Sequence, residues 1–202
     1  MTRSLLVVLM AVLITGCSST TGGEPSAGRS NPPSNPTTST APAEPSSALP
    51  PRPREIKLDG PNPCLLWTSD QLVQLLVQTT PVSGGPQENA AGYQACMYTA
   101  PPQSDVEFGF IATAVLDLDA TIYRGDTAQT KATVVDVDGF PAVQEMGNPE
   151  NASPCRLAIS TSPGQHLEVR AETRPGEYSV EQACDITMKA ATFAVQTLQT
   201  LR

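Results

Sequence analysis

Residues 155–171 read CRLAISTSPGQHLEVRA and contain two strand patterns joined by a turn. Apolar side chains recur at every second position on both sides of Ser162-Pro163-Gly164, which is typical of strands with one buried face. The apolar positions are Cys155, Leu157, Ile159, Leu167, Val169 and Ala171. The segment therefore predicts a β-hairpin. It also predicts that His166, which falls among the polar positions of the second strand, faces water.

The same alternation extends the sheet toward the N-terminus. A further strand is predicted from the apolar positions Val106, Phe108, Phe110, Ala112 and Ala114. Shorter strands are predicted near Ala95–Thr99, Thr133–Val137 and Ala142–Glu145.

Two capping boxes predict helices on either side of these strands. Thr68 and Gln71 open a helix whose face carries Leu72, Leu75 and Leu76, and which we expect to continue until Pro81 and Gly84-Gly85. Ser179 and Gln182 open a longer helix toward Leu201. Its apolar positions are spaced by three and four residues: Ala183, Ile186, Ala190, Phe193, Ala194 and Leu198.

The order helix, strands, helix predicts an α+β fold for residues 56–202, which form a single domain. We expect an antiparallel β-sheet of about five to six strands packed against an N-terminal helix and a long C-terminal helix. Two disulfides complete this prediction.

The cysteines indicate the redox compartment. The chain has five, and four of them, Cys64, Cys96, Cys155 and Cys184, lie in the domain. Four cysteines allow three pairings; we favour Cys64–Cys96 and Cys155–Cys184, because each pair ties the edge of a helix to a strand. No Cys-x-x-Cys spacing favours a metal site or a redox-active pair.

The N-terminus predicts export and a lipid anchor. Residues 1–16 combine Arg3 with the apolar run 5–14, a pattern typical of a secretory signal peptide and too short to span a bilayer. The sequence LITGC at residues 13–17 resembles the lipobox of bacterial lipoproteins, in which the cysteine receives the lipid and the preceding peptide is removed. This resemblance implies lipidation at Cys17 and a location on the extracytoplasmic side of the cell membrane.

Residues 17–55 carry the lipidated cysteine and a predicted disordered stalk. Residues 18–54 contain nine prolines and eight serines and no aromatic residue, so they have little apolar surface to bury.

Composition excludes several functions. The net charge of −8, with no basic cluster, argues against binding nucleic acid through phosphates. The single histidine argues against a His-based metal site or Ser-His-Asp chemistry, so no cofactor and no metal is predicted. Asp136-x-Asp138-Gly139 fits a strand-ending turn better than a calcium loop. Asp117, Asp119 and Asp126 fit a solvated loop better than a cation site.

Short motifs give a family resemblance. Asn62-Pro63-Cys64 ahead of a leucine-rich helix, Gly139-Phe140-Pro141-Ala142-Val143, a cysteine opening a strand and another early in the last helix resemble an actinobacterial lipoprotein family of unknown function. That family includes the mycobacterial Lpr-type lipoproteins. Cys96-Met97-Tyr98 departs from the Cys-x-Trp that the family leads us to expect. The resemblance implies a cell-envelope location and no established activity.

We therefore expect a non-catalytic, membrane-anchored lipoprotein that binds a lipid or protein partner in the cell envelope. An accessory or scaffold lipoprotein that docks on a membrane complex is the first alternative, and an exported hydrolase is the second. A ligand pocket would lie between the sheet and a helix, near Phe108, Phe110 or Phe193, although these aromatic residues fit an ordinary core better.

Overall fold

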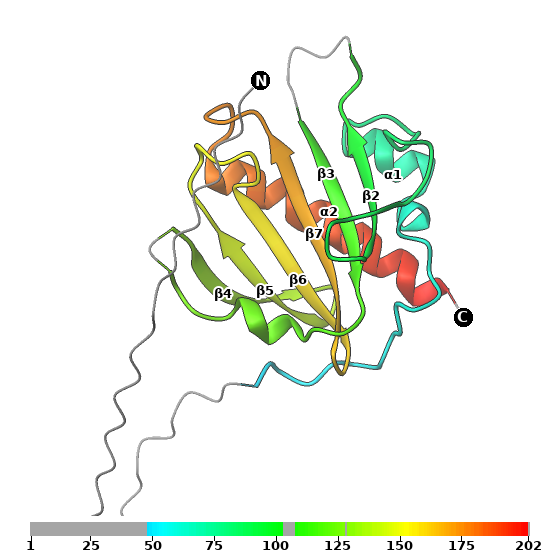
Figure 1. Cartoon of the computed structure of the whole chain (residues 1–202), viewed down its shortest axis with the longest axis vertical. Helices are drawn as coiled ribbons and strands as arrows, with labels where there is room; N and C mark the ends of the chain where they lie inside the picture. The colour runs from blue at the N-terminus through cyan, green and yellow to red at the C-terminus, as the bar shows by residue number, and fades with distance from the viewer. Residues whose placement is uncertain (1–47, 103–107, 128, 202) are drawn as a thin grey trace, which may run out of the picture. The chain divides into compact units, whose positions relative to one another are not determined.

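The computed structural model describes residues 48–102, 108–127 and 129–201. The predicted signal peptide, Cys17, most of the predicted stalk and Val106 lie outside these residues. The described part contains an antiparallel sheet and a long C-terminal helix (Figure 1), which confirms the predicted α+β class.

The sheet has seven strands in the order β1-β2-β3-β7-β6-β5-β4, and every neighbouring pair is antiparallel. The strands are β1 (Gln87–Glu88), β2 (Gln94–Thr99), β3 (Phe108–Val115), β4 (Lys131–Val137), β5 (Phe140–Met146), β6 (Cys155–Ser162) and β7 (Gln165–Thr173). The β6–β7 hairpin is the predicted one and lies near the middle of the sheet. The strand beyond the expected five to six is the two-residue β1.

Helix α2 (Val180–Thr200) runs across one face of the sheet, behind β6 and β7 in Figure 1. Its capping box between Ser179 and Gln182 is formed as predicted. The buried side of the helix differs partly from the predicted apolar stripe: Ile186 and Phe193 are only partly buried, whereas Cys184, Thr187, Ala191 and Val195 are buried. Small side chains dominate this side, which lets the helix approach the sheet closely.

Helix α1 (Ser69–Gln74) is shorter than predicted, although its Thr68–Gln71 capping box is confirmed. The chain leaves the helix at Leu76, whose φ is 59°. The Leu76 N–H then donates to Val73 O, and the Val77 N–H donates to Leu72 O. This is a Schellman ending. Leu76 was expected on the buried face together with Leu72, but this turn leaves 75% of Leu76 exposed.

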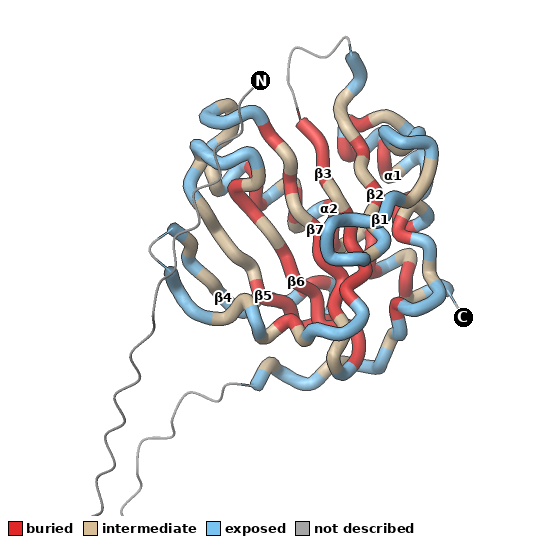
Figure 2. The backbone as a smooth tube through the Cα atoms, viewed as in Figure 1, coloured by how far each residue is buried: buried red, intermediate tan, exposed pale blue. Residues whose placement is uncertain are grey.

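The core lies between the sheet and the helices. Figure 2 shows buried segments concentrated in β3, β6 and β7. Trp67, which follows the 3-10 helix η1 (Pro63–Leu65), packs against Phe110 with ring centroids 4.8 Å apart. Its indole N–H donates to Ala190 O at 2.8 Å. One aromatic side chain thus joins the segment before α1, the sheet and α2.

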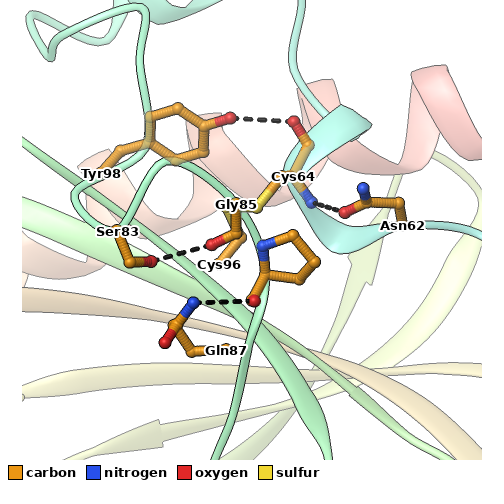
Figure 3. The surroundings of a disulfide bond; sticks show 8 residues. Asn62, Cys64, Ser83, Gly85, Gln87, Cys96 and Tyr98 are labelled. Atoms are coloured by element: carbon orange, nitrogen blue, oxygen red, sulfur yellow. Dashed lines mark hydrogen bonds between the residues drawn. A yellow bond between two sulfur atoms is a disulfide. The ribbon is translucent and has the colours of Figure 1, made fainter.

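The two disulfides join the elements that the sequence predicted. Cys64 bonds Cys96, and Cys155 bonds Cys184. The first bond links η1 to β2, and the Tyr98 hydroxyl reinforces this link by donating to Cys64 O at 2.9 Å (Figure 3). The second links the start of β6 to α2. Each therefore ties a helical segment to the sheet.

Residues 48–58 lead into the fold along one end of the sheet. Arg52 Nη1 donates to Ser160 Oγ at 2.6 Å, and the Ile56 N–H donates to Thr161 O at 2.8 Å. Arg54 also donates to Gln199 O. The end of the predicted stalk therefore makes specific contacts with the domain, because its arginines find acceptors there.

Candidate functional site

The sheet face opposite α2 carries the most distinctive chemistry of the described residues, and we call it the outer face. Strand pairing places Glu145, Arg156 and Arg170 side by side on it, since Glu145 lies opposite Arg156 and Arg156 lies opposite Arg170. Glu168 and Glu172 lie two residues before and after Arg170, and alternate residues of a strand share a face. Three neighbouring strands thus present one continuous set of charges.

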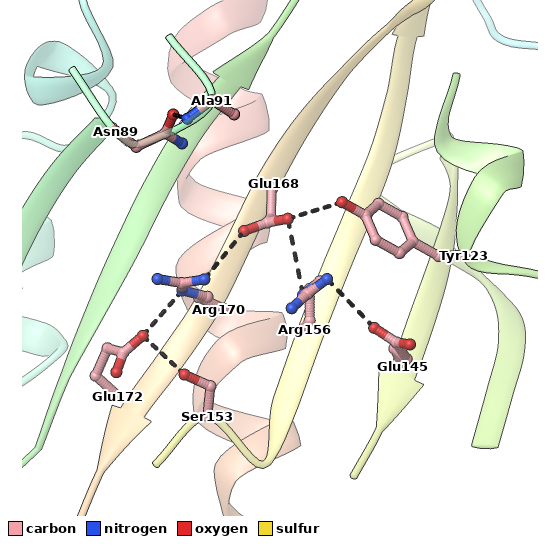
Figure 4. A network of polar contacts seen from close by, with 9 residues as sticks. All are labelled: Asn89, Ala91, Tyr123, Glu145, Ser153, Arg156, Glu168, Arg170 and Glu172. Carbon is pink, nitrogen blue, oxygen red and sulfur yellow. Dashed lines mark hydrogen bonds and ion pairs between the residues drawn. The ribbon is translucent and has the colours of Figure 1, made fainter. Parts of the chain in front are cut away.

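These five residues, Glu145, Arg156, Glu168, Arg170 and Glu172, form a connected set of ion pairs that we call the ionic row (Figure 4). Glu168 lies between the two arginines, with its carboxylate oxygens 3.7 Å from Arg156 Nε and 3.8 Å from Arg170 Nη1. Two arginines facing each other across strands would repel. Glu168 offsets that repulsion through one ion pair with each arginine.

The outer members of the ionic row fix its ends. Arg156 Nη1 lies 3.5 Å from Glu145 Oε2, and Arg170 Nε lies 2.9 Å from Glu172 Oε1. Ser153 Oγ also donates to Glu172 at 2.8 Å. About a third of each arginine side chain remains exposed, against 10% for Glu168. The arginines of the row are therefore paired with carboxylates and still partly accessible to solvent.

Tyr123, at the end of the 3-10 helix η2 (Ala120–Tyr123), contacts the Arg156 and Glu168 side chains of the ionic row. Its hydroxyl donates to Glu168 Oε2 at 3.1 Å, and the Arg156 guanidinium lies 5.0 Å from its ring centroid. Burial, followed by the charge of Glu168, raises the pKa of Tyr123 to about 12. Tyr123 is therefore a neutral hydrogen-bond donor throughout the physiological range.

The prediction that His166 faces water is wrong. Its side chain is fully buried, because Tyr123 packs edge-on against the imidazole with centroids 5.4 Å apart. Nδ1 lies 2.9 Å from Leu118 O, whereas Nε2 has no hydrogen-bond partner within the described part of the chain. Burial lowers the pKa of His166. Period-two alternation assigned the correct face, but it could not reveal that the segment before β4 covers part of that face.

A groove of about 580 Å³ opens beside the far end of the ionic row. Its walls include Met97, Gly109, Glu172 and Arg174. Gly109 has a structural reason to be glycine, because a Cβ at this position would lie 2.4 Å from Tyr98 O. Glu172 belongs both to the groove and to the ionic row, so the two features form one surface.

The aspartates that the sequence considered as cation ligands have structural roles. Asp136 Oδ1 accepts from the Gly139 N–H in the β4–β5 turn, so the turn interpretation is confirmed. Asp119 caps η2, Asp126 accepts from Ala132 N–H, and Asp117 accepts from the Tyr93 hydroxyl. Across the described ranges, no three His, Cys, Asp or Glu side chains form a group that could hold a metal ion.

The aromatic residues considered for a ligand pocket mostly form core. Phe110 is fully buried between Trp67, Tyr98 and Phe108. Phe193 is partly buried on α2, with Lys189 Nζ 5.9 Å from its ring centroid. Phe108 reaches the groove of the outer face as one of its lining residues. Phe108 is also buried and packs against Phe110 and Tyr178, so the core interpretation holds for Phe110 and Phe108.

Sequence reasoning missed the ionic row. The signal was present, since Glu168, Arg170 and Glu172 alternate with apolar residues in one predicted strand. Their connection to Glu145 and Arg156 depends on which strands are neighbours, and the order of the sheet is needed to find it. Among the residues that the structure describes, no helix is long and apolar enough to cross a membrane.

Comparison with known proteins identifies a family without a known activity. A family model described as a protein of unknown function, DUF3558, matches residues 12–197. No curated protein and no solved structure matches the chain. Because the matched range covers nearly the whole sequence, the chain belongs to the DUF3558 family of proteins of unknown function.

Proposed function

We propose that this protein is a membrane-anchored lipoprotein of the cell envelope that binds a protein partner through the outer face of its sheet. The observation that carries the binding role is the ionic row. Its charged side chains are fixed on strands by mutual ion pairs, and four of the five keep 19–33% of the side chain exposed. Such pre-organised charges favour recognition of a complementary surface.

A protein partner is favoured over a small molecule held inside the domain. The space between sheet and helices near Phe110 is filled by Trp67 and Tyr98. The groove that adjoins Glu172 is open to the outside. The accessible chemistry therefore lies on the surface, where a partner protein can contact charges and groove together.

The membrane anchor is supported by the lipobox-like sequence and by the disulfides. The two bonds use four of the five cysteines, and disulfides of this kind are typical of oxidising compartments. This is consistent with a separate role for Cys17, and the resemblance to actinobacterial lipoproteins supports the same location.

Fractionation of cells that express Cys17→Ser tests the anchor. The parent protein is expected in the membrane fraction, and the variant is expected in the soluble extracytoplasmic fraction, because two or more acyl chains are needed for stable attachment. Cys64→Ser/Cys96→Ser is the matched control, since it replaces two cysteines that form a disulfide and leaves Cys17 unchanged. A processed Cys17→Ser protein that stays in the membrane fraction would contradict the anchor.

Native mass spectrometry of the protein purified from its host membranes tests the partner. We expect a co-purifying protein whose yield falls at least tenfold in Arg170→Gln/Glu172→Gln. This double variant removes both members of the Arg170–Glu172 ion pair, and Glu168, which also loses Arg170, keeps its ion pair with Arg156. Asp70→Asn/Glu88→Gln, which changes two exposed carboxylates of α1 and β1, is the control. A protein that purifies without any partner, or with a lipid enclosed in its core, would contradict the proposal.

A further inference from the structure

The two edges of the sheet differ in the backbone hydrogen bonds made on their outer sides. At the β2 edge, the Gln78 N–H donates to Thr99 O and the Val82 N–H donates to Met97 O, each at 2.9 Å. The short strand β1 pairs with the beginning of β2. Strand β2 therefore has backbone partners on its outer side along most of its length. Such covering is the usual protection of an edge strand against other chains.

At the β4 edge, the described residues form no such covering. Strand β4 pairs with β5 at all seven of its residues and is the last strand of the sheet. The hairpin turn consists of Asp138 and Gly139, with φ values of 51° and 87°. In such a two-residue turn, Val137 and Phe140 exchange backbone hydrogen bonds. Because bonding alternates along an antiparallel pair, Val134 and Asp136 direct their backbone N–H and C=O groups away from β5.

The contact of Ala132 confirms this alternation. Its N–H donates to Asp126 Oδ1 at 3.0 Å rather than to β5. The N–H groups of Val134 and Asp136, two and four residues on, have no partner among the residues that the structure describes. The register of the β4–β5 pair has no bulge, and Val134 exposes 41% of its side chain. The edge thus offers donors and acceptors at the spacing of a strand.

The charge around the edge selects between a second copy and a different protein. Three carboxylates lie at or beside the edge: Asp126 accepts from the Ala132 N–H, Asp136 lies in β4, and Asp138 lies in its turn. Lys131 is the cation of β4 itself, and Arg54 approaches the turn through Gln199, which donates to Asp138. A second copy paired antiparallel about Val134 would place its Asp136 opposite Ala132, where Asp126 already occupies the N–H. Two carboxylates would then meet and one hydrogen bond would be lost. A strand with basic side chains avoids the repulsion, and one that pairs only with Val134 and Asp136 also leaves the Asp126–Ala132 hydrogen bond in place.

We propose that β4 accepts an extended, basic segment of another protein as an additional strand of the sheet. Backbone hydrogen bonds at Val134 and Asp136 hold the segment, and the aspartates select its charge. This surface is separate from the ionic row, and the proposal depends on neither the lipid anchor nor the partner proposed for the outer face.

Synthetic peptides added to the purified full chain test the proposal. The probe is the hexapeptide Lys-Val-Thr-Val-Lys-Val, compared with the same peptide in which glutamate replaces lysine. A third peptide keeps the lysines and carries N-methyl groups at alternate residues, so that one hydrogen-bonding edge is blocked.

Amide hydrogen exchange measured by NMR reports on each position of β4. At saturation the first peptide is expected to slow exchange at Val134 and Asp136 at least tenfold and to leave Glu88 unchanged. The N-methylated peptide is expected to slow neither.

Charge variants test the selection of a basic strand. Asp126→Asn/Asp136→Asn removes two charges, and the new amide oxygens can still accept from Ala132 and Gly139, so the fold is kept. The affinity for the lysine peptide is expected to fall at least fivefold at low salt. Asp70→Asn/Glu88→Gln, at the opposite side of the sheet, is the control and is expected to bind as the parent does. Val134→Pro removes an outward N–H, which an edge strand tolerates, and is expected to abolish the protection that the peptide gives to the Asp136 amide.

Three results would overturn the proposal. Equal protection by the N-methylated peptide would show that the peptide does not add as a strand. Equal or tighter binding of the glutamate peptide would remove the charge argument. Slow exchange at Val134 without peptide, together with a dimer in sedimentation, would show that a second copy occupies the edge. None of these results changes where the Cys17→Ser protein fractionates or what the Arg170→Gln/Glu172→Gln protein binds, so the two proposals fail separately.

Discussion

Leu76 adopts a backbone conformation that is unfavourable for a leucine. The residue after a helix in a Schellman ending adopts positive φ, a position that favours glycine. Leu76 has a φ of 59° and exposes 75% of its surface there. Its neighbours Leu72 and Val77 are buried on either side of the turn. Their burial fixes the conformation that Leu76 must accept.

Leu76→Gly is therefore expected to stabilise the protein. Removing the left-handed strain of a branched residue gains about 1–2 kcal/mol, and the greater freedom of glycine in the unfolded chain offsets about half of it. We expect the free energy of unfolding in urea to rise by about 0.5–1 kcal/mol. Gln74→Gly, inside the helix, is the control and should lose about 1 kcal/mol. A loss of stability in Leu76→Gly would show that its side chain has an essential contact.

His166 should make stability depend on pH. Burial lowers its pKa in the folded protein below the ordinary value of 6.5. The unfolded chain therefore takes up a proton first as the pH falls. The contribution of neutral His166 to the free energy of unfolding is fully present above about pH 6.5. Below that pH the free energy of unfolding decreases, by at most about 1.4 kcal/mol per pH unit, until the pKa of His166 in the folded protein is reached. The hydrogen bond to Leu118 O, followed by the charges of Glu168 and Asp119, partly opposes this lowering of the pKa, and Arg156 adds to it.

Urea unfolding at pH 7.5, 6.5 and 5.5 checks this dependence. The chain has one histidine, so His166→Gln should remove most of the slope in this interval even if it lowers stability at every pH. An unchanged slope in the variant would assign the effect to other groups.

Among the elements, α2 and β6 are joined at their ends by the Cys155–Cys184 bond. The bond closes a loop with a sequence separation of 29 residues, and constraining a loop of that length in the unfolded chain is worth about 3.5 kcal/mol in the chain-entropy view. Within the fold, Ala190, Ala191 and Ala194 let α2 lie close to the sheet, so the helix depends on contact area from many small side chains.

Cys155→Ala/Cys184→Ala is expected to lower the free energy of unfolding by about 2–4 kcal/mol. Equilibrium unfolding in urea under non-reducing conditions measures this, with Cys64→Ala/Cys96→Ala as the comparison because its loop is of similar length, with a separation of 32 residues. A loss below about 1 kcal/mol would indicate that packing of α2 alone holds the two elements together.

At the scale of the whole molecule, the oxidation state of the cysteines should match the proposed extracytoplasmic location. If the protein matures outside the cytoplasm, all four domain cysteines are oxidised when it is isolated. The Cys17→Ser protein, denatured without a reductant and treated with iodoacetamide, should take up no label by mass spectrometry, and four labels after reduction. Labelling before reduction would place at least part of the protein in a reducing compartment.

The charges of the molecule should govern its contacts. The chain is acidic, with a net charge of −8, and both proposed surfaces are rich in carboxylates. Partner binding at either surface should therefore weaken as salt rises, because charges near the surface are screened within about 8–10 Å at physiological ionic strength.

Local rules of the sequence were sufficient for much of the fold. The two capping boxes, the β6–β7 hairpin and the α+β class followed from the spacing of apolar residues and from turn chemistry, which act within a few positions of the chain. The disulfide pairing followed from the order of the predicted elements, and Cys64–Cys96 and Cys155–Cys184 are confirmed. The early end of α1 did not follow, because burial of Val77 rather than a breaker residue determines it.

The tertiary structure alone decided the surfaces. A strand pattern assigns His166 to a face but does not say that Tyr123, 43 positions earlier, will cover it. The ionic row exists because β7 lies beside β6 and β6 beside β5. Strand β4 is an edge because no described strand lies beyond it. Contacts between distant residues depend on which strands become neighbours. Periodicity along the chain carries no information about that order.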